Sequence, residues 1–539
     1  MTKKQVTILT FLSIAALVLG LMVSRRLWFR LDLTRNKAYT ISPVSRSLYA
    51  EIPDQVRLTY YVSDKLASIH PMPGEVSDLL REYAAYSHGK IRLTVRDPAR
   101  ANLADQVERL GILPQQIQTV DKDQASVTTV YTGILIEYLE NIDVLPVVFS
   151  LDTLEYDLTS RIRTLIRGTS RQLGIIMGDS YRQWNEDFGL LNQFFTQSGY
   201  QIRLIVPGEA IPDTLPVLLV LGGMEDFDNW ALYRIDRYIQ CGGKVFFALE
   251  GVYVDSKGSL EARVIEDQGL LEMVAAYGAK VKPELALDRS ALTLQYQIRT
   301  PTGSQYRISR YPHWIGILGE NGNSEHPVSA RFSGMDLFWP SPLELNTPEA
   351  VEGVPLFTTT GEAWSMTSNF STNPDVAYLF EQEAAETKGK KIMAAALSGI
   401  FPSWFAGAAK PVRGNSEEEL PDMPAETRPS RIIVVGDTDM ASGLISAALG
   451  RRNLDFLLQA VDWLANDDDI IGIRNRSAQM GRLDRIIDPP KKAAAMSFSQ
   501  ILNVVVFPLL VIILGIGITW RRRVRAAGLD EDKEHSDGV

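Results

Sequence analysis

The stretch that decides the fold is RQLGIIMGDS (171–180), followed by LPVLLVLGG (215–223) and KVFFALEG (244–251). Each contains a short apolar run of the kind that forms a buried strand. The segments between them place apolar residues at helical spacing, for example Ile235 and Ile239. Continuous apolar strands that alternate with helices predict a parallel sheet covered on both faces. We therefore expect a doubly wound α/β domain in the middle of the chain.

This order of strand, Gly-Gly turn, helix, Gly-Gly and strand resembles the class I glutamine-amidotransferase-like fold. In that family the strand at 244–251 would lead into a sharp turn with a nucleophilic Cys between glycines. Here Leu249 stands at the nucleophile position and Phe247 at the first glycine, so that Gly251 alone fits. Cys241, the one cysteine, lies upstream at a predicted helix end. The fold signature is present without its nucleophile.

Composition excludes several classes of function. A formal net charge of −10 over 539 residues argues against a nucleic-acid-binding surface. One cysteine excludes a disulfide framework and CxxC redox chemistry, and the five histidines lack the spacing of a zinc site. The chain contains neither GxGxxG nor GxxxxGK[ST], the phosphate-binding patterns. We expect no catalytic residue, no cofactor and no metal.

Two uncharged apolar segments, at residues 6–23 and 501–520, are long enough to span a bilayer. The first could instead be a cleaved signal peptide, but arginines follow it at once and no Ala-x-Ala site is visible. Arginines within residues 521–525 predict a cytoplasmic C-terminus. Two spans then place both termini in the cytoplasm and the main domains outside the cytoplasmic (inner) membrane.

The remaining sequence completes the domain plan. A βαβ pattern and further strands predict a compact, thioredoxin-like α/β domain, and antiparallel strands added to the central sheet are expected within residues 290–360. A Pro-rich, acidic stretch is expected to be an exposed linker. The predicted divisions are an N-terminal anchor at 1–30, the thioredoxin-like domain at 31–168, the amidotransferase-like domain with a β insertion at 169–404, the linker at 405–430, a C-terminal part of the same sheet at 431–490, the second span at 501–520 and a tail at 521–539.

Several turns at strand ends were weighed as sites. Gly178 and Asp179 follow the first strand, where α/β folds place ligands, and Gly222 with Gly223 could offer amides to an oxyanion. Asp437, within Asp437–Asp439, follows a later strand and could meet a cation or close a capping turn. A further alternative pairs Glu250 with Asp255 as acidic groups of a hydrolase.

Further landmarks follow one another in a recognisable order. They are LDLTRNKAYTIS (31–42), LLREYAAYSHGKIRLTVRDP (79–98), YTGILIEY (131–138), YDLTSRIRTLIRG (156–168), IDRYIQCGGKVFFALEG (235–251), IIVVGDTDM (432–440) and NLDFLLQAVDWLANDDDIIGIR (453–474). Together they resemble the GldG-type auxiliary components of ABC transporters, in a domain that is also similar to one in intraflagellar transport proteins. The resemblance implies an extracytoplasmic binding subunit that works with a separate ATPase and permease.

Three functions follow as hypotheses. The first is a non-enzymatic, membrane-anchored transporter component whose partners are ABC permease and ATPase subunits and an envelope protein or polysaccharide. The second is an envelope hydrolase that uses acidic residues. The third is a stand-alone extracytoplasmic receptor for a sugar or peptide.

Overall fold

The computed structural model describes residues 40–465 with gaps, together with Ile473 and scattered positions between 497 and 520. The gaps are 122–123, 149–150, 152–153, 169–170, 180, 223–226, 267–268, 301–302, 331, 375–386, 414–418 and 447–450. The predicted span at 6–23 lies outside the described residues, and so does much of the one at 501–520. Within the described part of the chain, no helix is both long and apolar enough to cross a membrane.

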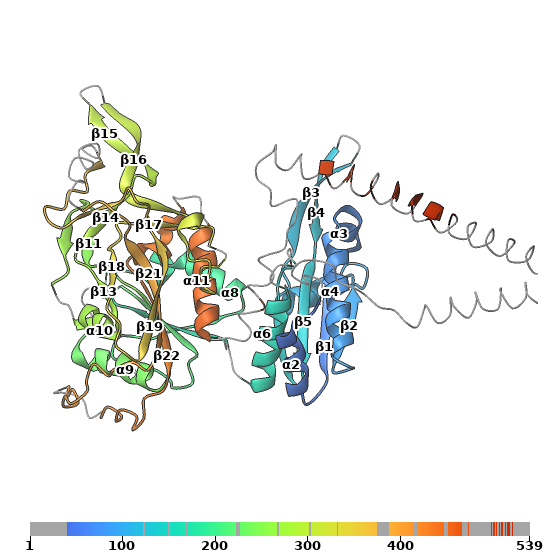
Figure 1. The fold of residues 1–539 in the computed structure, drawn as a ribbon, viewed down its shortest axis with the longest axis horizontal. Helices are drawn as coiled ribbons and strands as arrows, with labels where there is room; N and C mark the ends of the chain where they lie inside the picture. Colours follow the sequence, from blue (N-terminus) through green and yellow to red (C-terminus); the bar gives the residue numbers. More distant parts are fainter. Residues whose placement is uncertain are drawn as a thin grey trace, which may run out of the picture. The chain divides into compact units, whose positions relative to one another are not determined.

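The N-terminal part is built on a four-stranded mixed sheet in the order β2-β1-β5-β6 (Figure 1). β1 and β2 are parallel, whereas β5 is antiparallel to both of its neighbours. Alternate residues of β1, such as Val56 and Leu58, share a core with three helices that cover one face. The elements are α2 (Pro43–Glu51), β1 (Val56–Val62), α3 (Asp64–Ile69), α4 (Met72–Tyr86), β2 (Ile91–Arg96), α5 (Ala104–Arg109), β3 (Gln115–Asp121), β4 (Gln124–Val130), β5 (Thr132–Tyr138), β6 (Asn141–Leu145) and α6 (Leu154–Arg167).

The start of α2 shows how local sequence sets this arrangement. Ser42 caps the helix, since its hydroxyl accepts a hydrogen bond from the Ser45 amide at 3.0 Å, and Pro43 occupies the first turn. The carboxylate of Glu155 on α6 accepts bonds from the Ser42 amide at 2.6 Å and the Ser45 hydroxyl at 2.7 Å. The same contacts therefore cap α2 and join it to α6.

A nine-stranded mixed sheet forms the larger part, in the order β13-β18-β21-β22-β10-β9-β7-β8 with β19 beside β21. The five strands β22, β10, β9, β7 and β8 are mutually parallel, and the others are antiparallel additions. The strands are β7 (Gln172–Met177), β8 (Gln201–Leu204), β9 (Val217–Leu221), β10 (Lys244–Ala248), β13 (Ala279–Val281), β18 (Leu343–Leu345), β19 (Val351–Thr358), β21 (Ile392–Gly399) and β22 (Ser430–Val435). The predicted α/β class is confirmed, with a mixed sheet in place of a wholly parallel one.

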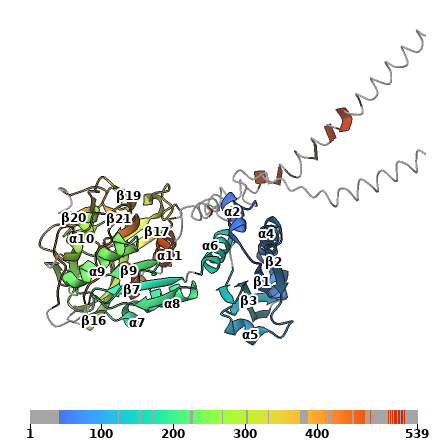
Figure 2. The same ribbon diagram turned by 90° about the horizontal axis from the view of Figure 1, so that it is seen from below.

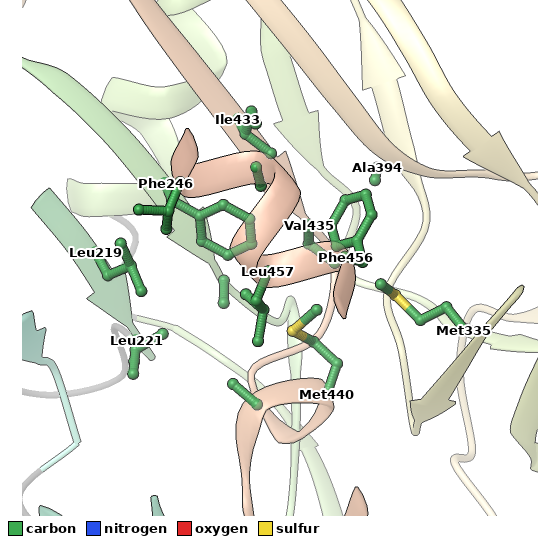
Figure 3. Packing of buried hydrophobic residues seen from close by; sticks show 14 of the residues in the cluster. Leu219, Leu221, Phe246, Met335, Ala394, Ile433, Val435, Met440, Phe456 and Leu457 are labelled. Atoms are coloured by element: carbon green, nitrogen blue, oxygen red, sulfur yellow. The ribbon is translucent and has the colours of Figure 1, made fainter. Parts of the chain in front are cut away.

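Helices cover both faces of this sheet. Successive residues of a strand point to opposite faces, so neighbouring residues of one strand pack against different helices. Phe246 packs with α8 and α11 on one face, where Figure 3 shows it close to Leu457 of α11, whereas Phe247 packs with α9 and α10 on the other. Figure 2 labels α9 and α10 on one side of β9 and α11 on the other. Both phenylalanines are completely buried. The helices are α7 (Trp184–Asp187), α8 (Gly189–Gln197), α9 (Asn229–Gln240), α10 (Gly269–Tyr277) and α11 (Arg452–Ala465).

The β insertion was expected to extend the large sheet, but only part of it does so. β18 and β19 join it, but three other strands of the region form a sheet of their own in the order β15-β16-β17. β15 and β16 pair antiparallel as a hairpin, from Ala291 opposite Ile315 to Thr300 opposite Gly303. The elements are β11 (Val252–Val254), β12 (Ala262–Val264), β14 (Leu285–Leu287), β15 (Ala291–Thr300), β16 (Gly303–Leu318), η1 (Gly319–Asn321), β17 (Gly334–Phe338), β20 (Trp364–Met366), η3 (Asp439–Ala441) and η4 (Gly443–Ser446).

Part of the predicted linker packs on α9. Leu420 is buried against Trp230 and Tyr233, and the Tyr233 hydroxyl donates to the Pro421 carbonyl at 3.0 Å. One apolar side chain and a few backbone carbonyls suffice to hold a segment whose charged side chains, such as Asp422, stay in solvent. Composition alone did not reveal this contact.

Candidate functional site

The parallel strands end together at one edge of the large sheet, in the order β8-β7-β9-β10-β22. Chain order reverses between β7 and β9, and doubly wound sheets bind ligands at the carboxyl ends of the strands beside such a reversal. Four carboxyl side chains follow strands at this edge: Asp179 after β7, Glu250 after β10, and Asp437 and Asp439 after β22. This edge is the candidate functional site.

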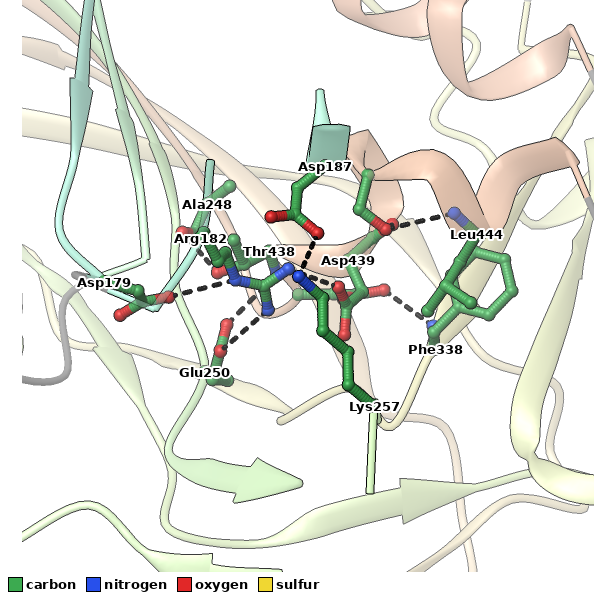
Figure 4. A network of polar contacts seen from close by, with 12 residues as sticks. Asp179, Arg182, Asp187, Ala248, Glu250, Lys257, Phe338, Thr438, Asp439 and Leu444 are labelled. Atoms are coloured by element: carbon green, nitrogen blue, oxygen red, sulfur yellow. Dashed lines mark hydrogen bonds and ion pairs between the residues drawn. The ribbon is translucent and has the colours of Figure 1, made fainter. Parts of the chain in front are cut away.

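The guanidinium of Arg182 lies among three of these carboxylates (Figure 4). Its Nη1 is 2.7 Å from Asp439 Oδ1, its Nε is 3.3 Å from Asp179 Oδ2, and its Nη2 is 3.9 Å from Glu250 Oε1. The Arg182 side chain is only 5% exposed. A buried cation with several acidic partners ties the ends of three strands together, and we name this group the Arg182 network: Asp179, Arg182, Glu250 and Asp439.

Burial shifts the protonation of two carboxyl groups here. It raises the pKa of Glu250 from 4.5 to about 8, with the nearby Asp179 raising it further and Arg182 opposing. Burial likewise raises the pKa of Asp437 well above its usual range, and the charge of Asp439 adds to this. Both shifts favour the protonated form of the carboxyl group, which relieves the crowding of like charges around one guanidinium.

The glycines at the ends of β7 and β9 are closely packed against neighbouring atoms. Gly222 adopts φ +75°, and a Cβ at this position would lie 2.1 Å from Asp179 Oδ2. A Cβ on Gly178 would lie 2.3 Å from the Phe227 ring. The Gly222 amide donates to the Ala248 carbonyl at 2.9 Å, so it is used within the fold and does not form the oxyanion donor that was considered. Gly223 lies outside the described residues.

The turn after β10 does not present a reactive group. Leu249 is fully buried in the core with α9 and α10, and its amide donates to the Val435 carbonyl at 3.0 Å. A Cβ on Gly251 would lie 2.2 Å from the Lys282 carbonyl oxygen, so this glycine is required by close backbone packing. Cys241 caps the C-terminus of α9, at the opposite end of β10. No nucleophile therefore stands at the elbow position.

The acidic-pair alternative does not match the geometry. Asp255 accepts a hydrogen bond from the Ser259 amide at 3.0 Å, while Glu250 accepts one from the Thr438 amide and faces Arg182. Asp437 accepts the Phe338 amide at 2.7 Å and serves as an anchor between β22 and β17. Among the described residues no group of acidic, His or Cys side chains is arranged to hold a metal ion.

Sequence reasoning placed Asp179, Glu250 and Asp437 at strand ends but missed Arg182, whose guanidinium contacts Asp179, Glu250 and Asp439. Arg182 lies three residues after Asp179, in a loop without a recognised motif. The signal that could have found it is an arginine close to the end of a buried strand, in a sheet whose other strand ends carry acids. The assembled edge can hold strand ends together and can take up or release a proton at Glu250.

Comparisons with known proteins found a family model and a relative that match this chain. Residues 35–137 match a Domain of unknown function (DUF7088). An uncharacterized protein of Borreliella burgdorferi is 25% identical over 508 residues, which cover 92% of this chain and 94% of that protein.

Two solved structures are also similar to part of the chain. The mmIFT52 N-terminal domain has a TM-score of 0.33 and 12% identity, and the match covers 55% of this chain and 98% of that domain. A ThuA-like protein from Parabacteroides merdae has a TM-score of 0.28 and 11% identity, with 55% and 91% covered.

The most extensive family match covers more than half of the chain. Residues 170–467 match the family described as "ABC-type uncharacterized transport system", and these residues contain the large sheet and the whole Arg182 network. The chain therefore belongs to this family of auxiliary components of ABC-type transport systems.

Proposed function

We propose that this chain is a non-catalytic, membrane-anchored auxiliary subunit of a GldG-type ABC transport system, which acts outside the cytoplasm by binding. The observation that carries the proposal is the buried Arg182 network at this edge of the large sheet. Arg182 and Asp179 occupy the place where doubly wound sheets bind ligands, and Leu249 is buried at the nucleophile position. Membership of the transport family also supports a subunit that binds a partner and does not catalyse a reaction.

The fold assignments within this proposal rest on strand order. The order β2-β1-β5-β6, with one parallel and two antiparallel pairs, supports a thioredoxin-like domain at 31–168. The parallel order β8-β7-β9-β10-β22 supports an amidotransferase-like domain from residue 169. Because β22 lies beside β10, the sheet is completed after the 405–430 segment, in line with the proposed C-terminal part at 431–490.

Partners form the first test. The full chain, tagged and solubilised from membranes in a mild detergent, is expected to co-purify with a multi-span permease and an ATPase of the ABC type. A tagged two-span membrane protein of unrelated function, expressed at the same level, serves as the control. Recovery of the chain free of both subunits, under conditions that keep other ABC complexes intact, would refute the transporter assignment.

The second test concerns membrane topology. Because the chain has one cysteine, replacing it leaves no other thiol that a reagent could label. In a Cys241→Ser background, Ser68→Cys on exposed α3 and Ser536→Cys in the tail each provide one thiol. A membrane-impermeant maleimide applied to intact spheroplasts is expected to label the first variant and to label the second only after lysis. Equal labelling of both, or labelling of neither before lysis, contradicts the proposed two-span topology.

A further inference from the structure

One face of the N-terminal sheet, which α5 covers in part, carries a second site, separate from the Arg182 network. The helices α2, α4 and α6 pack on one face of this sheet (Figure 1), so the alternate side chains of β1 and β2 point to the other. A cavity of about 460 Å³ lies on that face. We name it the arginine trough; the polar side chains that line it include Arg57, Thr59, Arg92, Thr94, Arg96 and Gln106.

Strand register places these side chains in rows. Arg57 lies directly opposite Arg92, and Thr59 lies opposite Thr94 in the next row of the same face. Arg96 ends the series on β2, roughly 13 Å from Arg92 at about 3.3 Å per residue. The trough therefore has two cationic ends with a floor of hydroxyl groups between them.

The charge of the trough is unbalanced within the described residues. Glu137 pairs with Arg57 at 3.2 Å, while no carboxylate among the described side chains pairs with Arg92 or Arg96. Like charges directly opposite each other on neighbouring strands are unfavourable. Such an arrangement is notable in a chain whose formal net charge is −10, and an anion bound in the trough would relieve it.

The other side chains that line the trough indicate which class of anion it would bind. Guanidinium groups form paired hydrogen bonds with carboxylates and phosphates, and the threonine hydroxyls and Gln106 amide suit a ligand with many hydroxyl groups. Ile142 lines another part of the cavity and is 54% exposed, so it gives an apolar surface against which a sugar ring can pack, whereas Leu135 in the same lining is buried. A bilayer is flat, so lipid headgroups would reach only the rim of this concave face.

We propose that the arginine trough binds an acidic oligosaccharide. Acid groups spaced along the glycan contact Arg57 and Arg92 at one end and Arg96 at the other, and the intervening sugars lie over Thr59 and Thr94. This inference goes beyond the proposed transporter role and does not depend on it, because it concerns binding by the isolated chain.

The test is isothermal titration of the detergent-solubilised full chain with penta-galacturonate, and with maltopentaose as the neutral counterpart. We expect saturable binding of the acidic glycan only, with an affinity that falls as salt is added. The double variant Arg92→Gln/Arg96→Gln should weaken binding at least tenfold, and Arg92→Lys/Arg96→Lys should retain part of it. The matched control, Arg100→Gln, removes an exposed arginine that pairs with Asp64 at 3.4 Å, and should bind as the wild type does.

Further binding measurements distinguish the acidic glycan from the other possible ligands of the trough. A phosphorylated pentasaccharide that binds more tightly than penta-galacturonate still supports the site and assigns phosphate as its acid group. Equal binding by a glutamate-rich pentapeptide overturns the glycan class. Binding of phosphatidylglycerol vesicles that the double variant abolishes, with no binding of either acidic glycan, identifies a membrane surface and refutes the proposal. A correctly folded double variant, judged by its circular dichroism, that binds penta-galacturonate unchanged also refutes it.

Discussion

Replacing Arg182 with methionine tests the central claim, that this residue holds the strand ends together. The substitution keeps much of the side-chain volume and removes the charge, so Asp439, Asp179 and Glu250 lose a partner at 2.7, 3.3 and 3.9 Å respectively. Removing one partner of a buried ion pair costs about 3–5 kcal/mol, since the remaining charge stays buried and unpaired. At roughly 2–4 °C per kcal/mol for a domain of this size, the melting temperature should fall by about 10 °C.

The measurement is thermal unfolding of the detergent-solubilised chain, followed by circular dichroism at pH 5 and pH 8. The deficit of Arg182→Met should be smaller at pH 5, because protonation neutralises carboxylates that the variant leaves unpaired. Arg413→Met is the matched control: its ion pair with Asp228 is as short, at 2.7 Å, but about half exposed, so its loss should cost less than about 1 kcal/mol. If the two variants melt alike, or if the deficit of Arg182→Met is the same at both pH values, the reasoning is wrong.

Three further predictions concern the same sheet. The pKa of Glu250 is raised from 4.5 to about 8, so its contribution to stability is fully present below pH 4.5 and is lost as the pH rises through 8. Between these values each pH unit changes the free energy of unfolding by about 1.4 kcal/mol. Glu250→Gln should therefore flatten the fall in melting temperature between pH 5 and pH 8. Gly222→Ala should lower the melting temperature by several degrees and disturb Asp179, since the new Cβ would lie 2.1 Å from its carboxylate at a φ of +75°; an unchanged melting temperature contradicts this. Phe246→Ala empties a fully buried position and should cost about 3–5 kcal/mol by the same measurement, whereas Val412→Ala, at an 87% exposed residue, should cost almost nothing.

Periodicity predicted the helices well because burial in a sandwich of layers imposes it directly. Ile235 and Ile239, which were expected at helical spacing, are both buried on α9, together with Leu232 and Tyr238. In α11, Leu457 is buried, whereas Leu454 is only half-buried. The pattern specifies which face turns inward, but how deeply each position is covered depends on elements that are distant in sequence.

Strand partners were harder to predict than strands. β21 was expected as a returning strand, yet its insertion between β18 and β22, antiparallel to both, depends on pairing across long loops. The separate β15-β16-β17 sheet has the same cause. Backbone hydrogen bonds carry no side-chain signature, so a sequence indicates that a strand exists far more clearly than it indicates the neighbour that the strand chooses.

The Arg182 network shows how acidic side chains are accommodated at the ends of buried strands. Buried acids destabilise a fold unless they are paired or protonated. Here Arg182 pairs with Asp439 and Asp179, and Glu250 holds a proton near neutral pH. Pairing and protonation together make this edge of the sheet a structural joint. The proposed glycan site, the arginine trough, lies on the N-terminal sheet, where Arg92 and Arg96 have no carboxylate partner among the described residues.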